Sequence, residues 1–273
     1  MKLYFYFIST ILYLFLFPSC GEYARVLKST DIDEKYEYAQ IYYNQGKYSR
    51  SITLLDDVVR MYSRGSEDAE NALYLLAMSH FNMKDYLSAG EYFIRYCNTY
   101  PRGSKAMECR FNLAYGDYMD SPDARLDQSI TNKAIRELDS FVESYPRSSL
   151  ADSATAMRYE LVDKLCYKEY LTATLYLNLG TYMGNNYEAA VITARNAQRD
   201  YPYTKYREDL GYVIFKARYE AAEYSVDDKK EDRLREAYDE YYTFSTEFPD
   251  GKYTKEVNKL FEKINKQLEK YEE

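Results

Sequence analysis

An aromatic residue followed by proline recurs four times in this chain, each time after an amphipathic stretch, and this recurrence limits the possible folds more than any other feature. The pairs are Tyr100-Pro101, Tyr145-Pro146, Tyr201-Pro202 and Phe248-Pro249. Proline has no backbone N–H and its ring clashes with the preceding helical turn, so each pair predicts the end of a helix. With 10 glycines and 6 prolines in 273 residues, the chain is poor in the turn residues of β-sandwiches and dinucleotide-binding folds. The sequence therefore predicts an all-α protein.

Small side chains recur at fixed places between these stops and indicate how the helices pair. In three places a polar turn ends in tyrosine and a small residue follows three positions later, and two more small residues take the equivalent place before Pro146 and Pro249. A small side chain lets two antiparallel helices approach closely. The residues after the turns are Ser51, Ala89, Ala134, Ala190 and Ala237, and those on the preceding helices are Ala39, Ala77 and Ala114.

These features resemble the tetratricopeptide repeat, a helix–turn–helix unit with small residues at the helix crossing and a terminal proline. The resemblance implies a right-handed α-solenoid of about five tetratricopeptide-like helix pairs, with an extended concave face. Longer internal loops are expected from Asp120 to Ser129 and from Ser225 to Arg233. The repeats fit at about 31–64, 70–103, 106–148, 160–204 and 207–251.

A last amphipathic stripe follows the fifth repeat. It consists of Val257, Leu260, Phe261, Ile264 and Leu268, spaced as one face of a helix. Terminal repeats of a solenoid need a helix that shields them from water, so this stripe predicts a C-terminal capping helix within a repeat domain at 31–273. A helix that binds a partner is the alternative.

The N-terminus has the pattern of an export signal. Lys2 precedes an apolar stretch at 3–17, and small Ser19 precedes Cys20. This arrangement resembles the lipobox of bacterial lipoproteins, which implies a signal peptide at 1–19, acylation of Cys20 with fatty acids such as palmitate, and a lipidated tether at 20–30. An ordinary secretory signal followed by an incidental cysteine is the alternative.

The composition argues against most kinds of catalytic or cofactor site, so we expect no enzyme, metal or cofactor. With one histidine, Ser-His-Asp triads and histidine-rich zinc sites are disfavoured, and His80 is expected to pack on a helix face. A net charge of −8 argues against nucleic-acid binding. The absence of tryptophan disfavours a sugar site. Cys97 and Cys109 are expected as free buried thiols, with a disulfide as the alternative.

Helix A of each repeat lines the concave face of such a solenoid, and its first two copies carry aromatic and amide side chains. Rings offer apolar contact and amides pair with backbone groups, so this groove is expected to bind an extended peptide that bears an aromatic residue. The alternative is that many of the rings pack against adjacent repeats. The predicted groove residues are Tyr36, Gln40, Tyr43, Asn44, Tyr74, Met78, Phe81 and Asn82, continued by Phe111, Tyr115 and Tyr118.

Basic residues gather around the junction of the fourth and fifth repeats, in a chain that is acidic elsewhere. Arginine can bind a carboxylate through two hydrogen bonds, so this cluster is a candidate partner-binding surface. The alternative is that local acids such as Glu208 and Asp209 balance these charges. The predicted partner-binding residues are Arg195, Arg199, Lys205 and Arg207, with Lys216 and Arg218 nearby.

Three blocks of the chain resemble the BamD family of outer-membrane lipoproteins, in its Bacteroidetes-type members. The first is Val26–Asp31 before Lys35–Ala39, and the second is Leu126–Thr131 with Ala134–Ser148. The third includes Lys164–Lys168, Tyr176, Tyr187–Ala190 and Tyr201–Thr204. The resemblance spans most of the chain after the signal.

The resemblance implies a scaffold of the β-barrel assembly (BAM) complex in Gram-negative cells, lipid-anchored in the outer membrane and facing the periplasm. Members of the family hold the POTRA domains of the barrel protein BamA and receive the C-terminal strand of unfolded outer-membrane proteins. Accessory lipoproteins are further candidate partners. The position of Arg207 after the Tyr-Pro-x-Thr block implies contact with the last POTRA domain. The alternatives are a tetratricopeptide adaptor lipoprotein that organises the envelope and a glycan-binding helical-repeat lipoprotein.

Overall fold

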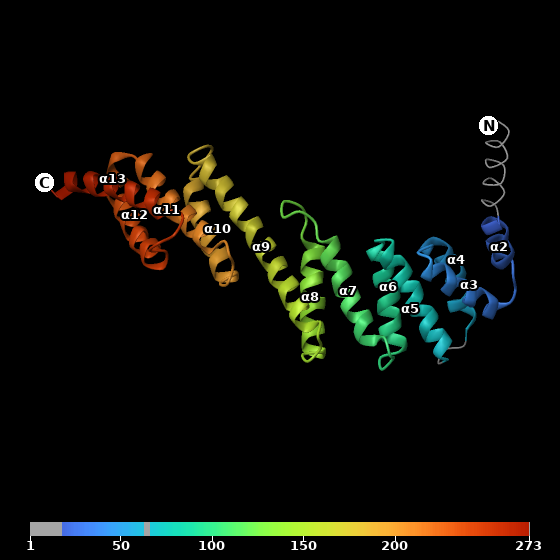
Figure 1. The fold of residues 1–273 in the computed structure, drawn as a ribbon. Helices are drawn as coiled ribbons and strands as arrows, with labels where there is room; N and C mark the ends of the chain where they lie inside the picture. Colours follow the sequence, from blue (N-terminus) through green and yellow to red (C-terminus); the bar gives the residue numbers. More distant parts are fainter. Residues whose placement is uncertain (1–17, 63–65, 273) are drawn as a thin grey trace, which may run out of the picture. The chain divides into compact units, whose positions relative to one another are not determined.

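The computed structural model of the chain describes residues 18–62 and 66–272. The predicted signal peptide lies outside them, apart from its last two positions. The described residues form helices and no strand (Figure 1). The helices are α2 (Pro18–Leu27), α3 (Ile32–Asn44), α4 (Tyr48–Met61), α5 (Glu67–Asn82), α6 (Tyr86–Thr99), α7 (Ala106–Asp120), α8 (Ser129–Ser144), α9 (Ala151–Leu179), α10 (Asn186–Asp200), α11 (Arg207–Glu223), α12 (Asp227–Glu247) and α13 (Thr254–Glu272).

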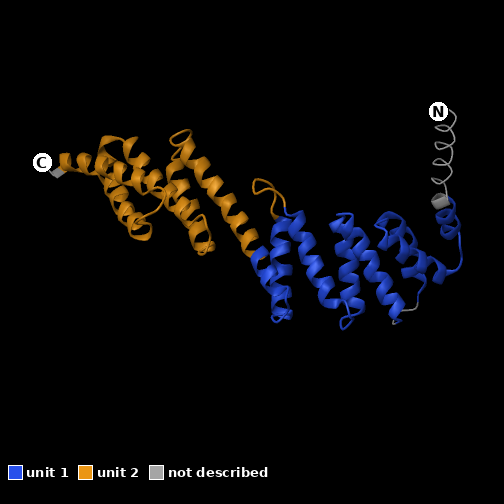
Figure 2. Ribbon diagram, in the orientation of Figure 1, with its two compact units in different colours: residues 1–121, 129–157 blue, residues 122–128, 158–273 orange. Residues whose placement is uncertain are grey.

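Helices adjacent in the chain pack as pairs, which confirms the predicted all-α fold of paired helices. The pairs in contact are α3/α4, α5/α6, α7/α8 and α11/α12. Helices α9 and α10 share one buried core, which contains Cys166 and Ala173 of α9 and Ala190 of α10. The last helix, α13, packs on α12 and α11, and its buried Val257 and Ile264 join the core of that pair. The chain divides into two compact units, with the boundary inside α9 (Figure 2). Unit 1 holds residues 1–121 and 129–157, and unit 2 holds residues 122–128 and 158–273.

The aromatic-proline pairs lie at helix ends, as predicted. Helices α6, α8, α10 and α12 each end one residue before the aromatic residue of a pair. The backbone N–H of that aromatic residue still donates to the carbonyl four residues earlier, as from Tyr100 to Tyr96 at 2.7 Å. The proline that follows has no N–H with which to continue the ladder.

The predicted small residues lie at the helix crossings and are buried. All eight of them are between 0 and 1% exposed. In the first pair the two positions are also hydrogen-bonded, since the Ser51 hydroxyl on α4 donates to the Ala39 carbonyl on α3 at 2.9 Å. A larger side chain at these positions would force the two helices apart.

Three elements differ from the sequence-based expectation. Helix α9 begins at Ala151 rather than near residue 160, because its 29 residues contain neither glycine nor proline to interrupt it. The loop expected from Ser225 to Arg233 is shorter, because α12 begins at Asp227, where two acidic residues favour a helix N-terminus. Part of the expected tether is helical: α2 packs on α3, with Val26 fully buried and the Tyr23 and Tyr42 rings edge to face at 5.6 Å. The loop between α7 and α8 spans the residues expected.

Tyrosine hydroxyls bind carboxylates of a neighbouring helix pair at two places, and at two more they join α11 to the last helix or to the residue before it. Burial, with the neighbouring carboxylate as a further cause, raises the pKa of Tyr74, Tyr212 and Tyr253. These rings therefore join the repeats through their polar ends as well as through their apolar faces, which accounts for part of the 35 tyrosines against 12 phenylalanines. The bonds run from Tyr74 to Glu108 (2.5 Å), from Tyr92 to Asp56 (3.2 Å), from Tyr212 to Glu256 (2.7 Å) and from Tyr253 to Asp209 (2.8 Å).

The cysteines and the histidine have the structural roles expected of them. Cys97, Cys109 and Cys166 are all free thiols: Cys109 and Cys166 are buried, whereas Cys97 is half-buried rather than buried as expected. Burial raises the pKa of each thiol. His80 stacks on Tyr92, with ring centroids 5.3 Å apart, and its Nδ1 lies 2.9 Å from an Asp85 carboxylate oxygen.

Candidate functional site

The predicted groove residues of α3 and α5 differ in how much surface they expose. Asn44 and Asn82, at the ends of the two helices, are exposed. Tyr36 is buried, with its ring edge to face on Tyr62 at 5.6 Å. The other five are half-buried: Gln40, Tyr43, Tyr74, Met78 and Phe81.

Polar contacts from one repeat to the next hold several of these side chains. The Asn82 amide donates to the Tyr43 hydroxyl at 3.3 Å, which links α5 to α3. The Asn112 amide of α7 lies 3.3 Å from the Met78 sulfur of α5. Tyr74 reaches α7 through its bond to Glu108. Non-covalent polar contacts therefore join α3, α5 and α7 along the face predicted as a groove. Because of these contacts, only part of each side chain can reach a ligand.

Phe81 belongs to an aromatic cluster of its own. Its ring contacts Tyr86 at 5.4 Å, Tyr115 at 5.9 Å and Phe93 at 6.0 Å between centroids. Phe111 stacks on Tyr115 at 6.1 Å, and Tyr115 contacts Tyr118 at the same distance. The rings predicted for the third repeat thus extend this cluster along α7. Part of the cluster packs one repeat against the next, which is the alternative to an open groove.

The predicted basic cluster of unit 2 consists of paired cations. Arg195 donates to Glu240 of α12 at 2.6 Å. The shortest charge-pair distance is 3.0 Å from Arg199 to Asp200 and 3.6 Å from Lys205 to Asp163. Lys216 pairs with Glu220 and Glu256, and Arg218 pairs with Glu188 and Glu236. The side chains of Arg199 and Lys205 are 71% and 64% exposed, so their pairs stabilise the fold little and both cations can still reach a partner. Lys216 and Arg218 are only 21% and 19% exposed, and they are held more firmly by their carboxylates.

Arg207 begins α11 and binds two groups of its own chain. It forms an ion pair with Glu247 near the end of α12, and its Nη1 lies 3.4 Å from the Pro202 carbonyl. Its side chain is 40% exposed. The acids expected to balance it bind elsewhere: Asp209 accepts from the Lys252 ammonium, and Glu208 accepts from the Tyr253 backbone N–H.

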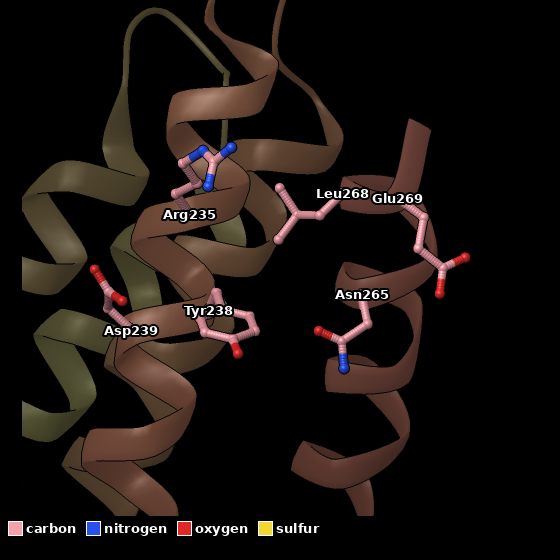
Figure 3. Close-up of a pocket in the computed structure, with 6 residues that line it drawn as sticks. All are labelled: Arg235, Tyr238, Asp239, Asn265, Leu268 and Glu269. Carbon is pink, nitrogen blue, oxygen red and sulfur yellow. The ribbon is translucent and has the colours of Figure 1, made fainter. Parts of the chain in front are cut away.

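Unit 2 contains two cavities that the sequence did not predict. One, of about 640 Å³, lies between α12 and α13, and in Figure 3 Tyr238 and Asn265 point toward one another across it. Its lining residues are Arg235, Tyr238, Asp239, Asn265, Leu268 and Glu269. The other, of about 520 Å³, is lined by the end of α9, the turn after it, Tyr187 of α10 and residues of α11. Both have the volume of small-ligand or side-chain pockets.

Neither a metal centre nor a membrane span is present in the described part of the chain. No group of three or more His, Cys, Asp or Glu side chains within residues 18–62 and 66–272 could hold a metal ion. None of the helices in these ranges is both long and apolar enough to cross a bilayer.

Comparison with known proteins identifies the family. A search of curated proteins finds no match to the chain. A family model described as an outer membrane lipoprotein, YfiO, matches residues 28–220. The matched region begins at the end of α2 and runs through most of α11, so it includes both the predicted groove and Arg207. The Bacteroidetes-type subgroup stays a prediction. The chain therefore belongs to the YfiO family of outer membrane lipoproteins, which is the BamD family that its sequence resembles.

Proposed function

We propose that the chain is a periplasm-facing scaffold of the β-barrel assembly machinery, which binds the POTRA domains of BamA and the C-terminal strand of unfolded outer-membrane proteins. The observation that carries the proposal is the family match across both units. The half-buried rings and exposed amides on α3 and α5 suit an extended strand that ends in an aromatic residue. Affinity purification from membranes tests the proposal: recovery of the barrel subunit supports it, and recovery of other envelope proteins alone would favour a general adaptor.

We further propose that Cys20 is the acylated residue. Lipid on this cysteine would hold the protein at the membrane, since each buried CH₂ of an acyl chain contributes about 0.8 kcal/mol. Mass spectrometry of the protein purified from membranes is expected to find an N-terminal peptide that begins at Cys20 and carries acyl chains. An unmodified peptide that begins at another residue would support an ordinary secretory signal instead.

Arg207 is the residue that we propose for the POTRA contact. Arg207→Glu is expected to weaken binding of the isolated POTRA segment about tenfold, because an approaching carboxylate would meet a like charge. Thermophoresis with the full chain in detergent measures this affinity.

The ion pair with Glu247 supplies a matched control for Arg207. The charge swap Arg207→Glu with Glu247→Arg restores that intramolecular pair. If Arg207 contacts the partner directly, the swap leaves binding weak. Full recovery in the swapped protein would show that Arg207 acts only by positioning α11 against α12, and the assignment would fall.

A further inference from the structure

The segment at the end of α9 shares four of its eight residues with the segment at the end of α3. Both read Ala-x-x-Tyr-x-Asn-x-Gly, at 39–46 and at 173–180. Ala39 and Ala173 are both fully buried. Gly46 and Gly180 both have positive φ angles, of 72° and 55°, where glycine is favoured. Both helices end within two residues of this glycine, α3 at Asn44 and α9 at Leu179, so the positions between alanine and glycine can be aligned.

This alignment places three residues of α9 in the register predicted for the peptide groove. Thr174, Leu177 and Asn178 occupy the positions that Gln40, Tyr43 and Asn44 occupy on α3. On α3 the tyrosine at this register accepts a hydrogen bond from the next repeat. On α9 all three residues line the 520 Å³ cavity, opposite Tyr212, Lys216 and Glu220, which share one face of α11.

Thr174 lies on the wall of this cavity, and a change of its side-chain rotamer would turn the hydroxyl toward a ligand. Its Oγ1 is buried and has no hydrogen-bond partner among the described residues. Two other threonines of the same helix bond back to the carbonyl four residues earlier, as Thr172 does to Lys168 at 3.0 Å and Thr155 to Ala151 at 2.9 Å. A buried hydroxyl without a partner is costly, whereas a ligand that supplies a donor or acceptor would satisfy it.

The charges on the cavity wall cancel. The Lys216 ammonium lies 3.4 Å from a carboxylate oxygen of Glu256 and 3.7 Å from one of Glu220. An ionic ligand would have to compete with these pairs, so the wall favours an uncharged occupant.

Two aromatic side chains of the wall, Tyr212 and Tyr187, are held by their packing. Tyr212 stacks on Tyr253 with centroids 4.1 Å apart, and its hydroxyl donates to Glu256. Tyr187 and Tyr224 lie parallel, 6.4 Å apart, with Tyr224 exposed at the rim. Flat, preformed aromatic walls favour a flat apolar group over a flexible chain.

We propose that the cavity between α9 and α11 is a second peptide-binding site, which takes an aromatic side chain of an extended, uncharged polypeptide segment. The ring enters between Leu177 and Tyr212, and the main chain of the segment bonds to the Thr174 hydroxyl and the Asn178 amide. This goes beyond the proposed function, which places peptide on α3 and α5 of unit 1.

Blocking the cavity tests the proposal. The probe is a fluorescein-labelled, amidated octapeptide in which serine alternates with phenylalanine, and anisotropy measures its binding to the full chain in detergent. Asn178→Trp, which fills the mouth of the cavity, is expected to weaken binding at least tenfold. The control Asn265→Trp fills the cavity between α12 and α13 (Figure 3) and is expected to leave binding unchanged.

The equivalent variant on α3 separates this proposal from the proposed function. Unchanged affinity in Asn178→Trp would overturn the second site, and so would an equal loss in Asn265→Trp. In either case Asn44→Trp, at the same register of α3, shows whether the unit 1 groove binds the probe. If oligosaccharide binds the cavity and the probe does not, the second site is also overturned.

A substitution of Thr174 tests the hydrogen bond itself. Thr174→Val removes the hydroxyl with little change of volume, and we expect about tenfold weaker peptide binding together with an unchanged or higher Tm. Thr174→Ser keeps the hydroxyl and is expected to bind within about twofold of the native chain. A lower Tm with full affinity in the valine variant would mean that the hydroxyl serves the fold, and would overturn its role as a ligand.

Discussion

Replacing Phe93 by alanine is expected to lower the free energy of unfolding of unit 1 by about 3–5 kcal/mol. Phe93 lies on α6, is fully buried, and packs against Leu73 and Ala77 of α5 and Leu113 of α7. Its removal opens a cavity that three helices border, and none of them can close it alone. Because each pair of a repeat protein is stabilised by its neighbours, the loss is expected to reach α7 as well.

Urea denaturation followed by circular dichroism measures this loss, and hydrogen exchange locates it. Exchange is expected to rise in α5, α6 and α7. Tyr203→Ala serves as the control, since Tyr203 is 92% exposed and its removal is expected to change stability by less than about 0.5 kcal/mol. A loss below about 1 kcal/mol in Phe93→Ala, or faster exchange confined to unit 2, would contradict the packing described.

Replacing Asp57 by alanine is expected to lower the free energy of unfolding by a similar amount, about 3–5 kcal/mol. The Lys35 side chain is 8% exposed, and its ammonium lies 2.6 Å from an Asp57 oxygen. Asp57→Ala would leave this buried charge without a partner. Lys35→Met removes the charge itself, and Asp57 keeps its other partner, Arg60, at 2.6 Å. The methionine variant is therefore expected to cost much less, and adding Lys35→Met to Asp57→Ala is expected to restore most of the stability.

The same ion pair predicts a dependence on pH. Hydrogen bonds from Lys35 and Arg60 hold the pKa of the Asp57 carboxyl below its usual value, against the opposing effect of burial. The contribution of the pair is therefore complete above the pKa of an unfolded aspartate, about 3.9, and is lost as the pH falls below it through the lower folded pKa. Urea midpoints measured from pH 6 to pH 2.5 are expected to fall more steeply in the native chain than in Lys35→Met. Parallel curves would refute the assignment.

Signals that act within a few residues predicted much of the fold. The proline after Tyr100 or Phe248 ends a helix by removing one donor, wherever that helix packs. The crossing residues Ala77 and Ala190 could be recognised because only a small side chain fits there. The start of α9 could not be predicted, because the sequence permits a helix to begin anywhere from Ala151 onward. Propensity alone does not decide where such a helix begins.

The candidate sites could be predicted only in part, since they depend on contacts between residues far apart in the chain. Tyr74 has the composition and register of a groove residue, but its hydroxyl binds Glu108 in the next repeat. Arg195 binds Glu240, and no local pattern joins these two positions. The cavity beside Thr174 did have a sequence signal, in the shared Ala-x-x-Tyr-x-Asn-x-Gly segment, although its open volume depends on how α11 lies against α9.

The tyrosine hydroxyls that reach into the next helix pair also encode the order of the pairs. Apolar contacts alone would tolerate the exchange of one helix pair for another, because the helices cross at an alanine in most of the pairs. A tyrosine hydroxyl that binds one particular carboxylate does not tolerate exchange: Tyr74 meets Glu108, and Tyr92 meets Asp56, only when the repeats follow in their native order. A chain with two hairpins transposed would keep its hydrophobic stripes and lose these matches. The tyrosine hydroxyls thus favour the native order of the helix pairs over a shuffled order. Replacing these tyrosines by phenylalanine would remove this preference while leaving the helices formed.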